Sequence, residues 1–479
     1  MPADHHLKLC FKSSPVLSIF STASLLFLTT SAHSAGFALI ENSASGMGKA
    51  FAGAAAVAED ASTVWFNPAG MTYLNEKLEG KSQLTNALHI VSAKTEFKDR
   101  GSSLPASLGG GATPGDKNIT SRVTSPVPNL YYVHPISDKL QFGLAVNGPF
   151  GSKTEYDEDW VGRYQATLTD MKTVNINPSL SWKVNDKLSV GGGVSAQYIT
   201  VKLGSSFDST GACLKSALSP LKPGETDKRA MLGRCAAAYP AAQAARVETD
   251  SQAVVEGDDF SFGFNLGLLY QPTKKTRIGV SYRSKVKHDL EGDATYNVDA
   301  DLQQIADDYN IKDYTNKAIK ASVELPDSVS LSLAHKVNSR LELLGDVTWT
   351  QWSTFQELHI KDTRGNTVSQ VDEKWKDVTR VSLGANYKYN DKLTLRTGVA
   401  YDEEPIPSAR FRTPRIPGND RTWVSVGAGY KVNKKFALDF GYSHLFLKET
   451  PIDNPEGFSV KGLYNSHVDI LSAQVNYTF

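Results

Sequence analysis

The chain has 479 residues, with 51 Lys and Arg against 51 Asp and Glu, and 40% of its residues are hydrophobic. This balanced charge argues against a nucleic-acid partner, which would favour a strong basic excess. The sequence has no uninterrupted run of 18 apolar residues, so a membrane-spanning helix is not expected.

Residues 1–34 have the features of a secretory signal peptide. Lys8 and Lys12 give a positive start, residues 16–28 form a short apolar segment, and Ala32-His33-Ser34 is a small-residue cleavage site. A membrane anchor is the alternative, but the apolar segment is short and rich in Ser and Thr. We therefore expect an exported protein.

Residues 35–75 do not have the pattern of a strand. They contain many Gly and Ala residues, and their apolar residues are irregularly spaced. Such a segment fits inside a barrel as a plug, or hatch. Asn67-Pro68-Ala69 predicts a helix start, with Asn67 as the N-cap and Pro68 at the first helical position. Lumen-facing glycines of later strands would leave room for the hatch (Gly384, Gly398, Gly427 and Gly441).

Residues 76–479 alternate between apolar and polar positions, which indicates strands with one apolar face. Six short turns rich in Asn, Asp, Ser and Lys separate these runs (137–139, 185–187, 273–275, 338–340, 390–392 and 433–435). If both chain ends lie on the short-turn side, six turns imply fourteen strands. A soluble β-sandwich gives the same alternation, but the export signal, the long strands and the polar second face favour the membrane. We predict an all-β fold: a 14-stranded antiparallel transmembrane β-barrel plugged by a small N-terminal hatch.

The expected third strand is interrupted by Asn147-Gly148-Pro149-Phe150-Gly151. Proline cannot donate to a strand ladder, and glycine weakens a strand interior. The interruption predicts a gap in the wall, whose backbone groups need partners from the protein or line a ligand path. A simple β-bulge is the alternative.

The longest loops are predicted at 205–258 and 297–318. Residues 230–245 are rich in Ala and favour a helix, and the second loop has apolar residues at helical spacing. These segments either pack on each other as a lid or form a landing site for a hydrophobic ligand. Cys213 and Cys235 lie in the first loop, and two cysteines of an exported protein predict a disulfide, with a free pair as the alternative.

Several charged residues could face the lumen or the outside. Arg380, Arg396 and Asp402 lie on the polar faces of their strands, where they either pair with each other and the hatch or contact a ligand. Four arginines lie in or beside a later loop that should face outward (Arg410, Arg412, Arg415 and Arg421). They either bind lipopolysaccharide phosphate or form a solvated face.

Motifs along the whole mature chain resemble the FadL family of outer-membrane channels for long-chain fatty acids and related hydrophobic compounds. They include Gly36-Phe37, residues 45–50, Asn67-Pro68-Ala69, Trp352-Ser353-Thr354-Phe355 and Trp375-Lys376-Asp377. The resemblance implies a fourteen-stranded barrel with a hatch that contains Phe37, Gly46, Gly48, Asn67, Pro68 and Ala69. It also implies a sideways exit at the interrupted third strand. The terminal Phe479 resembles the signal by which barrels are recognised for assembly.

The resemblance does not settle the ligand. In a fatty-acid member of the family two basic residues hold the head group, and their places here fall near Ser205 and Val371, with Lys202 and Lys374 close in sequence. Other members carry uncharged hydrocarbons. The ligand is therefore either a long-chain fatty acid or an aromatic or aliphatic hydrocarbon.

The sequence has no nucleophile elbow and no zinc-protease motif, so an outer-membrane lipid enzyme is disfavoured. No catalytic residue, metal or cofactor is predicted. An open porin or adhesin would lack the hatch. We expect a monomeric channel for passive uptake in the outer membrane of a Gram-negative bacterium. Its expected partners are the hydrophobic ligand, outer-membrane lipid and lipopolysaccharide, and the barrel assembly machinery.

Overall fold

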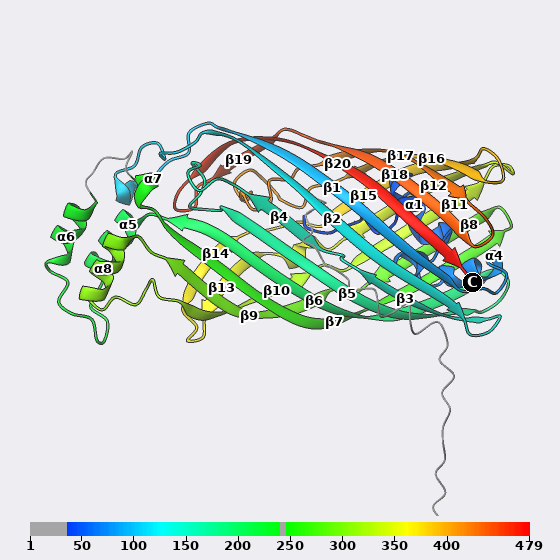
Figure 1. The fold of residues 1–479 in the computed structure, drawn as a ribbon, viewed down its shortest axis with the longest axis horizontal. Coiled ribbons are helices and arrows are strands. Elements are labelled where there is room, and N and C mark those ends of the chain that lie inside the picture. The colour runs from blue at the N-terminus through cyan, green and yellow to red at the C-terminus, as the bar shows by residue number, and fades with distance from the viewer. Residues whose placement is uncertain (1–35, 240–245) are drawn as a thin grey trace, which may run out of the picture.

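The computed structural model describes residues 36–239 and 246–479. The predicted signal peptide, residues 1–34, lies outside the described residues. The chain forms an antiparallel barrel that holds small helices inside it and carries further helices beyond one end (Figure 1). No helix in the described part of the chain is long and apolar enough to cross a membrane.

The predicted fourteen-stranded antiparallel barrel is confirmed. Several wall strands consist of two consecutive pieces that share one course along the wall. β20 pairs with β1 from Gln83↔Thr478 to Asp99↔Gly462 and closes the barrel. In chain order the strands are β1 (Gln83–Asp99), β2 (Asn118–Pro135), β3 (Leu140–Asn147) with β4 (Gly151–Glu155), β5 (Leu168–Lys183), β6 (Leu188–Phe207), β7 (Ser251–Thr273), β8 (Thr276–Arg283) with β9 (Val286–Asn297), β10 (Lys317–Leu325) with β11 (Ser328–Lys336), β12 (Leu341–Thr350) with β13 (Glu357–Asp362), β14 (Thr367–Asp372) with β15 (Val378–Lys388), β16 (Leu393–Asp402), β17 (Arg421–Lys431), β18 (Phe436–Leu447) with β19 (Thr450–Asn454), and β20 (Val460–Thr478).

The first polar residue of each short turn stabilises the turn through its side chain. The side-chain oxygen of Asn390 accepts hydrogen bonds from the backbone N–H groups of Lys392 (2.9 Å) and Leu393 (2.8 Å). Asn185, Asn338 and Asn433 form the same pair of bonds in their own turns. Since this side chain satisfies the turn locally, each hairpin is specified by its own few residues.

The outer face of the wall is apolar. On β7 the side chains of Phe260, Phe262, Phe264 and Leu266 are exposed, whereas the intervening Asn265 is buried in the lumen. This is the alternation expected when one face of each strand contacts lipid and the other faces the barrel interior.

The hatch is a set of four small helices inside the barrel, at the end that carries the short turns and the C-terminus (Figure 1). They are α1 (Ala44–Met47), α2 (Ala54–Val57), α3 (Thr63–Phe66) and α4 (Gly70–Lys77). The glycines of the wall allow the hatch to approach closely: a Cβ added to Gly398 would lie 2.2 Å from the carbonyl oxygen of Lys49.

The predicted helix start in the hatch is displaced. α4 begins at Gly70 with Ala69 at the N-cap, two residues later than predicted, but Asn67 makes the predicted capping contact, since its side-chain oxygen accepts from the backbone N–H of Ala69 (3.1 Å). Asn67 and Pro68 instead form a tighter turn, in which their carbonyl oxygens accept from Gly70 and Met71, three residues on. The Asn67 amide donates to the carbonyl oxygens of Ala55 (2.7 Å) and Leu268 (3.0 Å), so this residue joins the hatch to the wall.

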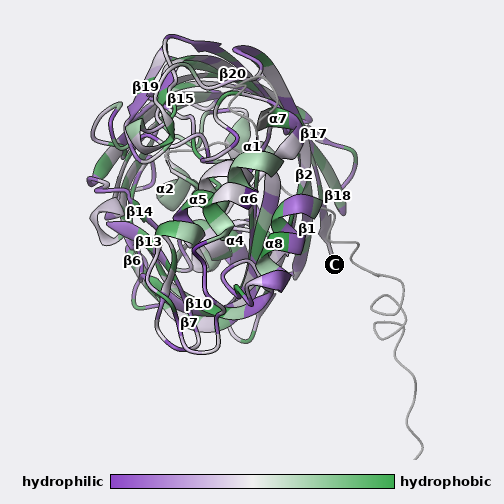
Figure 2. Cartoon of the chain, turned by 90° about the vertical axis from the view of Figure 1, so that its left-hand side faces the viewer, coloured by the Kyte–Doolittle hydropathy of each residue, from purple (hydrophilic) through white to green (hydrophobic). Residues whose placement is uncertain are grey.

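The long loops form a helical cap at the other end of the barrel. Its helices are α5 (Ser209–Leu218), α6 (Met231–Ala238), α7 (Arg246–Thr249) and α8 (Ala300–Asp308), and viewed from this end they lie within the outline of the wall (Figure 2). Cys213 and Cys235 form a disulfide between α5 and α6. Both cysteines pack with Met231, Leu302 and Ile305 in one apolar cluster, as in a lid. Residues 240–245 of the predicted Ala-rich helix lie outside the described residues.

Candidate functional site

The wall is open beside the interrupted third strand. β2 pairs with β3 from Leu130↔Val146 to Pro135↔Gln141. β4 continues the course of β3, but within the described residues it pairs with β5 and not with β2. The change occurs at the predicted interruption, Asn147–Gly151. A gap in the ladder therefore lies between β2 and β4.

A short segment of the hatch, residues 37–39, lies against this gap from the inside, and we call it the strap. The N–H of Leu39 donates to the carbonyl oxygen of Pro149 (2.8 Å), and the N–H of Gly151 donates to that of Phe37 (2.9 Å). Ala38 and Phe150 form an antiparallel bridge between these two bonds. The strap thus satisfies backbone groups that the interrupted strand leaves without a neighbour.

The strap also places an aromatic ring in an aromatic cage. The ring of Phe37 lies 4.6 Å from that of Trp352, 5.4 Å from that of Trp375 and 5.5 Å from that of Phe355, measured between centroids. Trp352 and Trp375 point inward because they lie in the breaks between β12 and β13 and between β14 and β15. We define the cage as Trp352, Phe355 and Trp375, all of which are buried.

Gly36 is required where the strap meets the cage. Its φ is +63°, and a Cβ at this position would lie 2.6 Å from the ring of Trp375. A residue with a side chain would be both strained and blocked here. The ring of Phe37 can therefore enter the cage only because residue 36 is a glycine.

A cavity of about 180 Å³ lies between the strap, the hatch and the wall. Apolar side chains of Leu39, Phe51, Phe66, Phe150 and Trp352 line it, together with a few polar groups, among them Arg283, Arg380, Asp346 and Asp402. Ligand pockets usually have volumes of roughly 300–1,000 Å³. With Phe37 in the cage the space is too small for a long acyl chain, so the structure shows a closed state.

The three lumen charges predicted from the sequence hold the hatch and the loops. Arg380 donates to the carbonyl oxygen of Ala50 (3.0 Å), and Asp402 pairs with Arg421 (3.1 Å). Arg380 and Asp402 also line the cavity, whereas Arg396 lies deeper toward the short turns. A ligand could therefore contact the first two but not Arg396 in the closed state.

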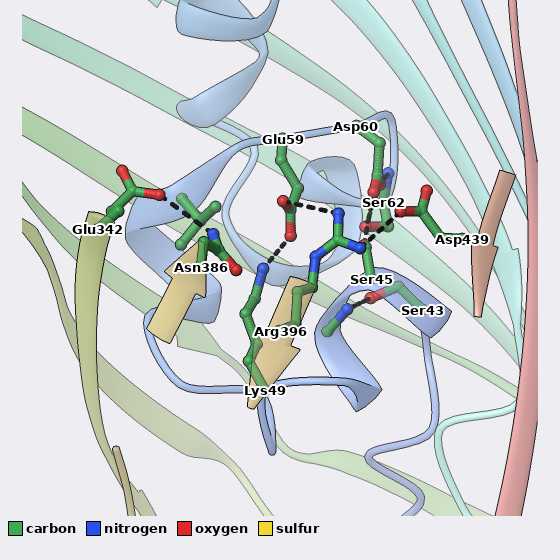
Figure 3. Close-up of polar contacts among 12 residues, drawn as sticks. Ser43, Ser45, Lys49, Glu59, Asp60, Ser62, Glu342, Asn386, Arg396 and Asp439 are labelled. Atoms are coloured by element: carbon green, nitrogen blue, oxygen red, sulfur yellow. Dashed lines mark hydrogen bonds and ion pairs between the residues drawn. The ribbon is translucent and has the colours of Figure 1, made fainter. Parts of the chain in front are cut away.

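Arg396 belongs to a buried ionic network between hatch and wall (Figure 3). Its guanidinium pairs with Glu59 (3.3 Å) and Asp439 (2.8 Å), and Lys49 also pairs with Glu59. Breaking a buried ion pair by removing one partner costs about 3–5 kcal/mol. The network therefore anchors the hatch in the barrel at a place separate from the strap.

The other predicted hatch residues lie outside the cavity. Gly48 packs against Gly427, where an added Cβ would lie 2.8 Å from the wall backbone, and Gly46 packs against the ring of Phe51. Asn67, Pro68 and Ala69 contact the wall near Gly191 and Gly267. These residues seat the hatch, whereas only Phe37 among the predicted hatch residues reaches the cage.

The prediction that Arg412 and Arg421 face outward is wrong. Arg412 pairs with Glu404 (2.5 Å) and Arg421 pairs with Asp402, and the two arginines are 2% and 3% exposed. The loop that carries them, residues 403–420, folds into the barrel mouth instead of projecting from it. Neither arginine is available to lipopolysaccharide, whereas Arg410 is exposed.

The role of Trp352, Phe355 and Trp375 was not predicted from the sequence. Their motifs were noted only as part of a resemblance. The sequence around them contains no Pro or Gly that would have marked the breaks in these two wall strands. Only the closed barrel brings them together around Phe37.

Comparisons with known proteins agree with this architecture. Residues 25–479 match the model of a family described as outer membrane protein transport protein (OMPP1/FadL/TodX). A long-chain fatty acid transport protein of Escherichia coli O6:H1 is 31% identical over 435 residues, which cover 90% of this chain and 91% of that protein. The crystal structure of a Pseudomonas aeruginosa FadL homologue superposes with a TM-score of 0.78 at 26% identity, covering 92% of this chain and 99% of the other. The toluene transporter TodX of Pseudomonas putida, at 18% identity and a TM-score of 0.61, shares the fold over 92% of this chain and 98% of its own.

Proposed function

This chain belongs to the OMPP1/FadL/TodX family of outer membrane transport proteins, and on that premise we propose that it takes up long-chain fatty acids passively and releases them sideways through the gap beside β4. The family membership establishes an outer-membrane transporter of hydrophobic compounds, not an enzyme. Fatty acid as the ligand and the sideways route are the proposal.

One observation carries the proposed route: the strap closes the gap and fills the aromatic cage at the same time. An acyl chain that enters the cage competes with the ring of Phe37 for the same apolar surface. Displacing Phe37 draws the strap away from Pro149 and Gly151, to which it is hydrogen-bonded. Ligand capture therefore enlarges the cavity and uncovers the gap in one movement.

The energies favour the ligand in this competition. Burying one Phe side chain is worth about 1.5–3 kcal/mol, whereas each buried CH₂ of an acyl chain is worth about 0.8 kcal/mol. Burying half of a chain of roughly sixteen CH₂ groups would contribute about two to four times as much as burying Phe37. No external energy source is needed, because the ligand moves from water to pocket to lipid.

The partners follow from the same proposal. A hydrophobic ligand enters past the helical cap, and outer-membrane lipid and lipopolysaccharide surround the apolar wall. Phe479, at the end of the closing strand, is 47% exposed on the outer face and stacks beside Tyr132 and Tyr477, where the assembly machinery can reach it. We propose a monomer, since a single chain closes the barrel.

Equilibrium dialysis of labelled oleate and labelled toluene against the purified barrel tests the ligand class. We expect saturable binding of oleate, because a long chain can fill both the cage and the adjoining cavity. Toluene should bind much more weakly, since its few carbons displace little more apolar area than Phe37 itself provides. Saturable toluene binding without oleate binding would instead identify a hydrocarbon channel.

A further inference from the structure

Arg415 lies inside the barrel mouth, close to the aromatic cage. Its guanidinium Nη1 donates to the carbonyl oxygens of Leu168 (2.8 Å) and Gly204 (3.3 Å), at neighbouring ends of β5 and β6. The preceding carbonyl, of Pro414, accepts from the hydroxyl of Tyr156 (2.7 Å). The following residue, Ile416, packs against the apolar cluster that contains the cage. Arg415 is thus fixed at the ends of β5 and β6, next to the apolar cluster that contains the cage.

The charge of Arg415 has no counterion in the described part of the chain. Its Nη1 is engaged by two carbonyl oxygens, and the side chain is still partly accessible. Burial lowers the pKa of Arg415 to about 10, which leaves it charged at pH 7. A cation in such surroundings is costly unless an anion joins it.

The nearby acid is held in a different contact. Glu373, in the connection between β14 and β15, is 4% exposed and accepts from the indole N–H of Trp375 (2.9 Å). Burial raises the pKa of Glu373 to about 8, so this carboxyl is neutral at pH 7. Arg415 therefore lies near Glu373, which contacts the cage through Trp375, and its positive charge is uncompensated at pH 7.

Two lysines near the same strand ends do not offer an equivalent charge. Lys202 pairs with Glu256 (3.3 Å), and Lys374 pairs with Asp372 (3.9 Å). Both lysines are about half exposed, since their side chains are 45% and 49% accessible. They belong to the surface of the protein, whereas Arg415 belongs to its interior.

We infer that Arg415 holds the carboxylate end of the ligand while the apolar chain occupies the cage and the cavity, an inference that rests on the proposed function. The guanidinium offers its remaining N–H donors to a carboxylate, and charge-assisted bonds of this kind are the strong ones. The site is therefore built for an amphipathic acid and distinguishes it from an uncharged hydrocarbon of the same length.

Binding of oleate and of oleyl alcohol by Arg415→Met tests this inference. We expect the affinity for oleate to fall about tenfold or more, because a charge-assisted bond is lost, while oleyl alcohol binds as it does to the parent protein. Arg410→Met, in the same loop but exposed, is the matched control and should bind both ligands normally. Arg415→Lys keeps the charge and should retain most of the oleate affinity.

The pH dependence supplies a second readout that a merely structural arginine would not produce. Arg415 and Glu456 are the charged side chains that act on Glu373. As pH rises through about 8, Glu373 becomes an anion beside Arg415 and should weaken oleate binding, whereas Glu373→Gln should bind equally at pH 7 and pH 9. This readout also serves if Arg415→Met does not fold.

The possible failures are distinct. Unchanged oleate affinity in folded Arg415→Met, or the same loss of affinity with pH in Glu373→Gln, would overturn the role of Arg415. If the parent protein binds neither oleate nor oleyl alcohol, the proposed function itself fails. Equal losses of both ligands in Arg415→Met mean that Arg415 only shapes the pocket, which also overturns the inference.

Discussion

Replacing Pro149 and Gly151 with valine is expected to abolish uptake of oleate without weakening its binding. The substitution returns one backbone N–H donor and adds two β-favouring side chains beside the free edge of β2. The gap between β2 and β4 should narrow or close. Uptake of labelled oleate by cells whose own channel is deleted should fall by at least about tenfold, while the purified variant keeps its affinity.

The matched control for this variant is Gly345→Val, in the intact wall strand β12. A Cβ there would meet Leu383 at 3.7 Å, an ordinary contact, so the added side chain should be tolerated. This control should transport at the parent rate. Normal uptake by a folded, surface-exposed Pro149→Val/Gly151→Val protein would mean that the ligand passes straight to the periplasm, and the sideways route would be wrong.

Deleting residues 35–75 is expected to turn a closed channel into one that conducts ions. The barrel should still assemble, because β1 and β20 close the wall without help from the hatch. Without the hatch, the cavity would connect with the opening of about 1,000 Å³ that lies among the short turns. Planar-bilayer recordings should show stable conductance steps that the full-length protein lacks.

Folding of the deletion variant is checked by its shift in gel mobility on heating, which distinguishes a closed barrel from an unfolded chain. A folded variant without any gain in conductance would show that the helical cap alone seals the pore. In that case residues 35–75 would not act as a plug, and the ionic network around Arg396 would serve only the stability of the wall.

The strands were predictable because their signals are local. Each turn carries its own Asn, Ser or Thr, whose side chain bonds the next backbone N–H groups, and the alternation on either side sets which face is apolar. Counting turns therefore gave fourteen strands. The breaks at Gly148-Pro149 were also local, since proline and glycine disrupt a ladder wherever they occur.

The features missed by sequence analysis depend on contacts between distant residues. That the strap would pair with the interrupted strand could not be predicted, because residues 37–39 and Phe150 are far apart in the chain and neither pattern indicates its partner. The loop of Arg412 and Arg421 has the composition of a solvated surface, yet pairing with Glu404 and Asp402 turns it inward. Arg415 was predicted to face outward for the same reason, because the composition of its loop is that of a solvated surface.

A reversible lock between strap and gap tests the central claim most directly. Ala38 and Phe150 form a bridge with hydrogen bonds on either side rather than between them, a geometry in which the Cα atoms lie about 4.5 Å apart. A disulfide needs Cα atoms roughly 4.4–6.8 Å apart, so Ala38→Cys/Phe150→Cys should cross-link on oxidation. Parent protein treated with the same oxidant and reductant controls for the native Cys213–Cys235 bond.

The measurement is uptake of labelled oleate by cells that carry the double-cysteine variant as their only channel, before and after reduction. The account predicts no uptake above that of channel-free cells while the strap is locked, and recovery toward the parent rate once the cross-link is reduced. Fully cross-linked protein that takes up oleate as fast as its reduced form would show that the strap need not move, and would contradict a sideways exit controlled by Phe37.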